Sequence, residues 1–362
     1  MSSRPGGTPA GSSTVHMFPG QGDFSLRPLL RALPAASLTR ALAEVFAEAD
    51  VVAAEFGVAP IGPRLLGDRP PTTLALTEEP PGTIQLALFG VSLAIHRALE
   101  SDGFGADRLL AVSFGELPAL TAAECCSVAD GARLACRLGQ LLTHHGGGMT
   151  LLDAGPPQAR RLLGLAGPDA ASVVLACVNH GGETVVSGPL PGLSAVEALA
   201  AERGIRAQRL RLPFMSHHPG LAREAGVFAH FARRLRLSAP RRQVFSVVAG
   251  RTYDADSDLP RALSACLVRP FSLPAVVGAG LARGSLAVEA GTGGTLANAV
   301  RRIDPDRQTL APFPDGLWQA AGRPPAPPSA PGPLTTGGPP TGTTRARPAP
   351  CEPVPTSARR EP

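Results

Sequence analysis

Between residues 149 and 212, strand-like and helix-like patterns follow one another in an order that strongly restricts the possible folds. Short apolar runs typical of strands alternate with stretches whose apolar residues recur at helical spacing. The strand-like runs read MTLLD, SVVLACVNH, ETVVSG and AQRLRL, and the helical stretches read PPQARRLLGLA and LSAVEALAAERG. Their order, β-α-β-β-α-β, is the ferredoxin-like pattern. We therefore predict a small ferredoxin-like subdomain over residues 149–212.

The sequence on either side of this segment also alternates between strand and helix. A short apolar run, VHMF, ends in the turn PGQG, and a later run, LLAV, leads into SFGE and a helical pattern. Amphipathic helical stretches occupy residues 37–57, 83–103 and 130–145. Strand patterns return in QVFSVVAG and LAVEAG. This alternation predicts a large α/β subdomain, formed by residues 15–148 and 213–318, into which the small one is inserted.

Both ends of the chain have a different composition. Residues 1–14 and 319–362 are rich in Gly, Pro, Ser and Thr and contain few residues that could join a core. Segments of this composition cannot bury enough apolar surface to offset the entropy of ordering. We expect both ends to be disordered.

Charge and hydropathy exclude two classes of partner. The net charge is +5, and every basic residue is Arg, but the arginines are scattered and form no run that could follow a phosphate backbone. No stretch approaches the roughly 18 apolar residues of a membrane span, and the N-terminus lacks the apolar core of a signal peptide. We expect a cytoplasmic protein that binds neither nucleic acid nor membrane.

The cysteines do not suggest a metal site. They show no C-x-x-C pair and no histidine at ligand spacing, and apolar neighbours predict buried free thiols. The six cysteines are Cys125, Cys126, Cys136, Cys177, Cys266 and Cys351.

The segment LLAVSFGEL has the arrangement of a nucleophile elbow. A strand leads into Ser113, and a helical pattern follows, with Gly115 kept and Ala111 in place of the first glycine of G-x-S-x-G. The amide groups at the start of such a helix can stabilise an oxyanion. Serine at a strand–helix junction is, however, more often a helix cap than a nucleophile, so the elbow alone leaves both interpretations open.

Two further motifs favour the nucleophile. FMSHHP, at residues 214–219, places two histidines on a loop after a strand, and FPGQG, at residues 18–22, is a glycine-rich turn after the first strand. A serine next to a histidine base is the usual arrangement for nucleophilic acyl transfer. The chain therefore contains both halves of a Ser–His pair.

Taken together, these motifs resemble those of the acyl-CoA:acyl carrier protein transacylase family, which includes malonyl transacylases and the acyltransferase domains of polyketide synthases. The resemblance spans Val15 to Ile303. It implies an α/β-hydrolase-like large subdomain with an inserted ferredoxin-like small subdomain, in agreement with the pattern above. Its landmarks, in the family's order, are FPGQG, Gln85, the serine elbow, Met149, VNHGGETVVSGP, SHHP, FSVVAGR, LVRPFS and VEAGTGGTLANAVRR.

The resemblance assigns roles by position. It implies that Ser113 is the nucleophile and His217 the general base and acid. The main-chain carbonyl of Ser272 would orient the His217 ring, and the backbone N–H groups of Gln21 and Phe114 would form the oxyanion hole.

The resemblance assigns the roles of three further residues less directly. His218 stands where the family usually has a small residue, and is therefore the weaker candidate base. Asn179 and Gln85 either hold loops near the substrate pocket or make structural hydrogen bonds, and the sequence leaves both interpretations open.

The implied reaction is ping-pong acyl transfer. An acyl thioester forms an acyl-serine, which a phosphopantetheine thiol then attacks. No bound cofactor is needed, since coenzyme A or the carrier protein's phosphopantetheine arm is a substrate. The implied partner is an acyl carrier protein, as acceptor and in some reactions also as donor, and we expect a monomer.

The chain departs from the family where malonyl-type substrates are recognised. Family members that use such substrates carry an arginine on the helix after the elbow, in a pattern like K-R-G-Q-L-M, which pairs with the free carboxylate. Here the pattern is RLGQLL and the position is Leu138. Arg137 lies about 100° around the helix, although a one-residue shift of the alignment would restore it. Without a partner, a buried malonyl carboxylate loses several kcal/mol.

Two more departures surround the same pocket. Val112 replaces the histidine that the family has beside the nucleophile, and Phe214 and Met215 in FMSH match neither YASH nor HAFH. We therefore predict a discrete transferase for a non-carboxylated acyl group, of the starter, aminoacyl or dipeptidyl type, in polyketide antibiotic biosynthesis. The alternatives are a malonyl-CoA:acyl carrier protein transacylase, an editing acyl-thioester hydrolase and an inactive carrier-protein docking module.

Overall fold

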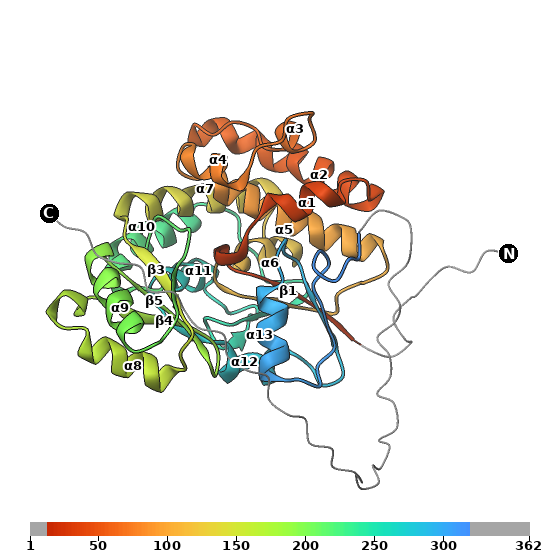
Figure 1. Cartoon of the computed structure of the whole chain (residues 1–362). Coiled ribbons are helices and arrows are strands. Elements are labelled where there is room, and N and C mark those ends of the chain that lie inside the picture. Colours follow the sequence, from red (N-terminus) through yellow and green to blue (C-terminus); the bar gives the residue numbers. More distant parts are fainter. Residues whose placement is uncertain (1–12, 319–362) are drawn as a thin grey trace, which may run out of the picture. The chain divides into compact units, whose positions relative to one another are not determined.

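The computed structural model describes residues 13–318. Within this range the chain forms two β-sheets with helices around them (Figure 1), so the mixed α/β class predicted from the sequence is confirmed. The two terminal segments for which disorder is predicted lie outside the described residues, apart from Ser13 and Thr14. The predicted disorder is wrong for Thr14, because this residue already belongs to the first strand, where it lies opposite Leu286.

The first sheet has the strand order β11-β10-β1-β2-β7-β8, and its strands from β11 to β7 run parallel. Strands buried on both faces carry nearly continuous apolar runs, as VHMF and LLA do. Phe18 at the end of β1 lies opposite Ala111 at the end of β2. The turns that follow these strands, PGQG and SFGE, are therefore neighbours. The strands are β1 Thr14–Phe18, β2 Arg108–Ala111, β7 Gln243–Ser246, β8 Arg251–Thr252, β10 Leu286–Glu289 and β11 Thr309–Leu310.

Side chains of this sheet alternate between two cores, as successive residues of a strand must. Phe18 and Leu109 pack into the larger core with α2, α5 and α7, whereas Met17 and Leu110 pack with α12 and α13. Figure 1 shows α1 to α5 and α7 gathered on one side of the molecule. The helices of this part are α1 Leu26–Ala32, α2 Ala36–Ala49, α3 Gly62–Leu65, α4 Thr73–Glu78, α5 Thr83–Ser101, α6 Glu116–Ala122, α7 Val128–His145, α10 Ala222–Ala232, α11 Leu259–Val268, α12 Leu273–Gly280 and α13 Thr295–Ile303.

The second sheet has the order β6-β3-β5-β4-β9. Its first four strands are antiparallel and are joined along the chain in the predicted order β3-α8-β4-β5-α9-β6. Strand β9 comes from the later part of the chain and adds parallel to β4. One face packs on α8 and α9, and the other carries a small apolar cluster around Met149 and Cys177. The elements are β3 Gly148–Leu152, α8 Pro156–Leu165, β4 Val174–His180, β5 Glu183–Gly188, α9 Leu190–Glu202, β6 Ala207–Arg209 and β9 Phe271–Ser272. The subdomain boundaries at residues 148/149 and 212/213 stay a prediction.

Helix α7 illustrates how local sequence sets the elements next to the site. The hydroxyl of Ser127 accepts a hydrogen bond from the Asp130 N–H at 3.1 Å and caps the start of the helix. Gly146, at φ 75°, ends it. Leu138 and Leu142, four residues apart, lie on one buried face of the helix. That face looks toward the elbow.

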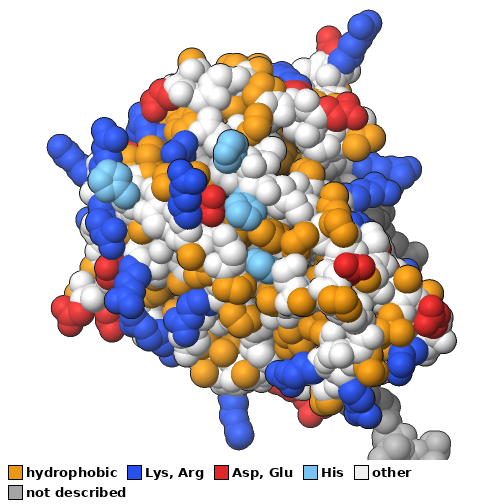
Figure 2. Space-filling model, turned by 90° about the vertical axis from the view of Figure 1, so that its left-hand side faces the viewer, with side chains coloured by type: hydrophobic (Ala, Val, Ile, Leu, Met, Phe, Trp, Pro, Cys, Tyr) orange, Lys and Arg blue, Asp and Glu red, His pale blue; other side chains and the backbone are white. Residues whose placement is uncertain are grey.

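The surface on the side of α8, α9 and α10 carries many arginines. Figure 2 shows arginine side chains at many points of this face, among fewer carboxylates and scattered apolar side chains. Of the helices between residues 13 and 318, none combines the length and hydropathy that crossing a bilayer requires.

Candidate active site

Ser113 occupies a strained turn between β2 and α6. Its φ is 57°, in the left-handed region that non-glycine residues rarely adopt, and it opens a short 3-10 helix, Ser113–Gly115. A Cβ on Gly115 would lie 2.2 Å from the carbonyl oxygen of Phe18, so only glycine fits there. This tight strand–turn–helix geometry is the one that a nucleophile elbow requires.

His217 contacts Ser113 through a fully specified hydrogen-bond chain. The distance from His217 Nε2 to Ser113 Oγ is 2.8 Å, and that from His217 Nδ1 to the carbonyl oxygen of Arg269 is 2.7 Å. A carbonyl can only accept, so Nδ1 carries the proton and Nε2 is left to accept from the serine hydroxyl. The imidazole is thus held as the tautomer that a general base needs.

The carbonyl that holds His217 belongs to Arg269, not to Ser272, and this corrects the role implied by the resemblance. Ser272 is the N-cap of α12, and the carbonyl of an N-cap residue is directed into the helix that it opens. Arg269 follows the last turn of α11 in an extended conformation, with φ −93° and ψ 131°. This conformation turns its carbonyl out of the helix direction and makes it available to His217.

Burial sets the protonation state of His217. The residue is only 2% exposed, and desolvation lowers the pKa of His217 to about 4. The bond to the Arg269 carbonyl acts in the opposite direction but is the smaller effect. At neutral pH the imidazole is therefore uncharged and can accept a proton.

His218 makes different contacts. Its Nδ1 accepts from the N–H of Gly220 at 3.0 Å, so its Nε2 donates to the carbonyl oxygen of Ser172 at 2.8 Å. Both ring nitrogens are thus used in backbone hydrogen bonds. The structure places His217, and not His218, against Ser113.

The PGQG turn lies against Ser113. A Cβ on Gly20 would be 3.6 Å from Ser113 Cβ and 4.0 Å from its Oγ. Next to it, the side-chain oxygen of Gln21 accepts from Gln85 Nε2 at 2.9 Å. Gln85 is buried and touches the site through Gln21, and it is not among the described residues that line a cavity at Ser113.

A second contact fixes the same turn from the other side. One carboxylate oxygen of Asp23 accepts from the N–H groups of Gly294 and Thr295, at 3.0 and 2.9 Å, at the start of α13. Asp23 was not predicted to belong to the site, although it directly follows PGQG. Arg269 was not predicted either, and its signal in the sequence is Pro270, because a residue before proline favours an extended backbone.

Two cavities meet at Ser113. The smaller has a volume of about 10 Å³, room for about one water molecule. Its apolar lining residues are Phe114, Leu117, Leu138, Leu142, Phe228, Leu263 and Leu267. The larger is a cleft of about 430 Å³ between the two sheets, which also holds His217. Its lining includes Val112, Met149, Leu151, Cys177, Asn179, Val185, Leu210 and Phe214.

The predicted pocket residues divide between these cavities. Leu138 lines the small cavity, and Val112, Asn179 and Phe214 line the cleft. Asn179 also donates to Glu183 at 2.7 Å, so it holds the β4–β5 turn as well as facing the cleft. Met215 is buried outside both cavities.

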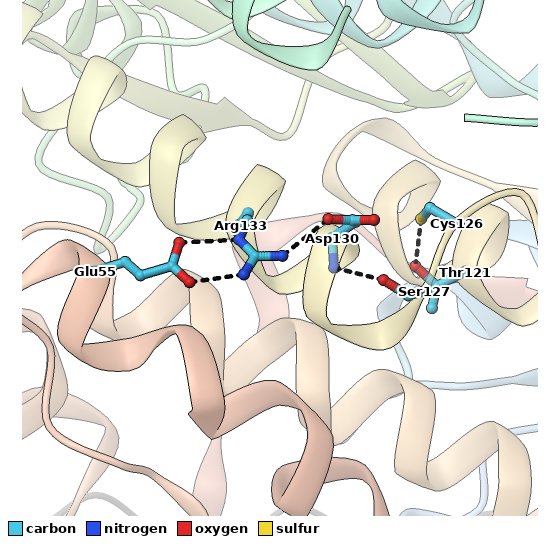
Figure 3. A network of polar contacts seen from close by, with 6 residues as sticks. All are labelled: Glu55, Thr121, Cys126, Ser127, Asp130 and Arg133. Atoms are coloured by element: carbon cyan, nitrogen blue, oxygen red, sulfur yellow. Dashed lines mark hydrogen bonds and ion pairs between the residues drawn. The ribbon is translucent and has the colours of Figure 1, made fainter. Parts of the chain in front are cut away.

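Arginines of α7 do not reach the small cavity. Arg133 pairs with Glu55 and Asp130 (Figure 3). Arg137 Nη1 lies 3.3 Å from the side-chain oxygen of Gln140 on the same helix. Neither arginine lines either cavity, whereas Leu138 does.

The described cysteines, Cys125, Cys126, Cys136, Cys177 and Cys266, are free, and Cys351 lies outside the described residues. Between residues 13 and 318, no group of His, Cys, Asp or Glu side chains has the arrangement of a metal site.

Known proteins share this sequence pattern and fold. The profile of the family described as "Acyl transferase domain" matches residues 17–301. Polyketide synthase GfsA of Streptomyces halstedii is 29% identical over 253 residues, which cover 68% of this chain but only 3% of GfsA. The spectinabilin polyketide synthase system protein NorB of Streptomyces orinoci is 32% identical over 258 residues, covering 67% of this chain and 11% of NorB.

Among solved structures, malonyl-CoA:acyl carrier protein transacylase from Xanthomonas oryzae pv. oryzae is similar with a TM-score of 0.68 and 28% identity, covering 82% of this chain and 93% of that one. The acyltransferase domain from the second module of the salinomycin polyketide synthase gives a TM-score of 0.65 and 27% identity, over 85% of this chain and 73% of that one.

Proposed function

This chain belongs to the acyl transferase domain family, and from that premise we propose that it moves a non-carboxylated acyl group, through an acyl-serine on Ser113, onto the phosphopantetheine thiol of an acyl carrier protein. The observation that carries the proposal is the 2.8 Å contact between Ser113 Oγ and the unprotonated Nε2 of His217. Because a carbonyl group fixes the other ring nitrogen, this contact has the polarity of a nucleophile–base pair.

In the first half-reaction, Ser113 Oγ attacks the thioester carbonyl while His217 Nε2 takes the hydroxyl proton. The negative charge develops on the carbonyl oxygen, where we assign the N–H groups of Gln21 and Phe114 as donors. Gly20, next to Gln21, lies against Ser113, and Phe114 directly follows it, which supports that assignment. The tetrahedral intermediate then collapses, the C–S bond breaks, and His217 returns the proton to the leaving sulfur.

The second half-reaction runs the same steps with a new thiol. The phosphopantetheine thiol gives its proton to His217 and attacks the carbonyl of the acyl-serine. When the C–O bond to Ser113 breaks, His217 returns the proton to the serine oxygen. The neutral imidazole that burial maintains suits both halves, since it must accept a proton at the start of each.

The apolar side chains around the small cavity beside Ser113 support a neutral acyl group. Leu138 occupies the position where malonyl-specific relatives are expected to hold an arginine, and the described lining offers no cation. A carboxylate placed there would be buried without a partner, which costs several kcal/mol. The apolar wall of the cleft, with Met149, Leu151 and Val185, suits the body of a longer acyl chain or the pantetheine arm.

Malonyl transfer is the second candidate, and one residue favours it. Of the described residues that line the cleft, the one arginine is Arg206. Its side chain is 73% exposed and lies 4.0 Å from Asp153. An exposed guanidinium that already has a carboxylate neighbour holds a second carboxylate weakly, so we place this candidate behind the neutral acyl group.

The proposed partner is an acidic acyl carrier protein. The arginines on the face shown in Figure 2 offer positive charge at many points around that side of the molecule. Complementary charge of this kind steers encounter and suppresses wrong partners.

Intact-protein mass spectrometry tests the proposal. The protein is exposed to a panel of acyl-coenzyme A thioesters and acyl carrier proteins, with Ser113→Ala as the control that cannot form the acyl-enzyme. We expect a mass increase at Ser113 with neutral acyl groups, followed by loading of a carrier protein. Rapid labelling by malonyl would favour the malonyl transacylase, and release of free acid without carrier loading would favour an editing hydrolase. If neither a thioester nor a fluorophosphonate labels Ser113, the remaining interpretation is an inactive docking module.

A further inference from the structure

Glu116 lies at the centre of a buried polar cluster directly behind the nucleophile. Its side chain is fully buried, and its Oε2 accepts from the Tyr253 hydroxyl at 2.6 Å. Its Oε1 accepts from the hydroxyl of Ser246, which in turn accepts from the N–H of Ala249 at 2.9 Å. Burial raises the pKa of Glu116 to about 7. The catalytic steps above use none of these groups.

The cluster is joined to Ser113 through the backbone. Glu116 follows the nucleophile by three residues, and its N–H donates to the carbonyl groups of Ser113 and Phe114. The strained φ of Ser113 therefore depends on a turn whose far end is anchored by the Glu116 side chain. Ser246, at the end of β7, and Tyr253, directly after β8, supply that anchor.

Helix α11, which carries the His217 acceptor, borders the small cavity beside Ser113. Its Cys266 lines that cavity and donates through its thiol to the carbonyl of Ala262 on the same helix, at 3.8 Å. The next residue, Leu267, accepts from the N–H of His218 through its carbonyl at 2.9 Å. Arg269, at the end of the same helix, supplies the carbonyl that holds His217 Nδ1.

We propose that Glu116 is a positioning residue, which holds the Ser113 elbow in place against β7 and the segment after β8 and so keeps Ser113 Oγ within reach of His217. The inference rests on the proposed function, because it concerns the same Ser–His pair. Its physical basis is that a buried carboxyl group must keep its donors: a shift of either segment would leave it unpaired, at a cost that resists the shift. Ser113 and His217 come from parts of the chain 104 residues apart, so their contact requires that the surrounding structure hold the elbow in place.

The rate at which a fluorophosphonate labels Ser113 tests this inference without any acyl substrate. The maximal labelling rate and the half-saturating probe concentration are measured for the wild type, Glu116→Ala, Glu116→Gln and Tyr253→Phe. Glu55→Ala is the matched control, since it removes a glutamate that is hydrogen-bonded to Arg133 (Figure 3) and lines neither cavity at Ser113. Circular dichroism and thermal unfolding report whether each variant is folded.

We expect Glu116→Ala to lower the maximal rate by about 100-fold, the effect of a displacement of roughly 1 Å, with the half-saturating concentration unchanged. Glu116→Gln, which keeps hydrogen bonds to both hydroxyl groups, stays within about fivefold of the wild type, and Glu55→Ala matches the wild type. If Glu116→Ala does not fold, Tyr253→Phe carries the test, with an expected loss of about fivefold or more.

A folded Glu116→Ala variant, or failing that a folded Tyr253→Phe variant, that labels at the wild-type rate would overturn the inference and leave the proposed function intact. A wild-type protein that does not label at Ser113 would instead overturn the proposed function, and the inference with it.

Discussion

Ser113 and His217 face each other from two turns that each hold a non-glycine residue at positive φ, 57° and 54° respectively. Their side chains meet at 2.8 Å. The left-handed region costs an L-amino acid roughly 1–2 kcal/mol, so both halves of the pair are held in place by the surrounding structure. Such paired strain is typical of functional sites, where it fixes the direction of a side chain.

The strain at Ser113 predicts that replacing this serine by glycine stabilises the fold relative to alanine, although both variants are inactive. Both Ser113→Gly and Ser113→Ala remove the hydroxyl and should abolish acylation. Glycine adopts φ 57° without steric cost, so we expect Ser113→Gly to have a free energy of unfolding about 1 kcal/mol higher than Ser113→Ala. Urea unfolding of the two variants measures the difference. Equal stabilities would show that the turn is not strained.

The protonation of His217 predicts an unusual pH profile. Burial lowers the pKa of His217 to about 4, and only the neutral imidazole can take the serine proton. The rate of Ser113 acylation should therefore be flat between about pH 8 and pH 5.5 and fall below that with a midpoint near 4. Stopped-flow labelling with a fluorophosphonate measures the profile, and a midpoint near 6.5 would contradict it.

The low pKa of His217 should also make the stability of the protein depend on pH. In the unfolded chain the imidazole binds a proton at about pH 6.5, so between that pH and 4 the unfolded state holds more protons than the folded one. His217 therefore lowers the free energy of unfolding as the pH falls through this range. Circular dichroism at each pH, and recovery of the rate after return to pH 7, separate loss of the base from unfolding.

Regular elements and motif residues were predictable from the sequence, because their determinants are local. The helix predicted at residues 130–145 is α7, Val128–His145, and the elbow serine follows β2 as expected. The helix predicted over residues 37–57 is only partly correct, since the α-helix ends at Ala49. There the carboxylate of Asp50 accepts from the N–H groups of Ile61 and Gly62, both at 2.8 Å. A contact made across eleven residues leaves no periodic signal.

The site residues also divide into those set by local motifs and those set by contacts distant in the sequence. Ser113 and His217 come from motifs and were named from the sequence, and the structure brings them together. Which carbonyl accepts from His217 depends on how α11 ends. The resemblance implied Ser272, whereas the acceptor in the structure is Arg269, three residues earlier. The buried contacts of Glu116 with Tyr253 and Ser246 join segments about 130 residues apart. Partners of this kind follow from the topology of the sheet and not from any pattern along the chain.

The close approach of the elbow to β1 predicts a severe effect at Gly115. A Cβ there would lie 2.2 Å from the backbone oxygen of Phe18, and a backbone atom cannot move aside as a side chain can. We expect Gly115→Ala to lower the free energy of unfolding by about 3 kcal/mol and to remove acylation. Gly164→Ala is the control, because that glycine lies in α8 with open space around it. Thermal unfolding should show the control equal to or slightly above the wild type, and a stable, active Gly115→Ala would contradict the elbow geometry.

The last prediction concerns the choice of acyl group. Leu138 lines the small cavity beside Ser113, so Leu138→Arg would place a guanidinium where a malonyl carboxylate could pair with it. A charge-assisted hydrogen bond stabilises a complex by roughly 1.5–3 kcal/mol. We therefore expect the ratio of malonyl to neutral acyl-enzyme, measured by mass spectrometry with equal concentrations of the two thioesters, to rise by at least about tenfold.

Leu138→Met is the matched control, since it keeps the volume and the apolar character of the side chain and should leave the ratio unchanged. The arginine is longer than the cavity of about 10 Å³ can hold without rearrangement, so thermal unfolding must show that the variant is folded. A folded Leu138→Arg variant whose ratio equals that of Leu138→Met would mean that the acyl group does not reach α7. The acyl chain would then lie in the cleft between the two sheets, and selection would rest with residues such as Met149 and Arg206 that line it.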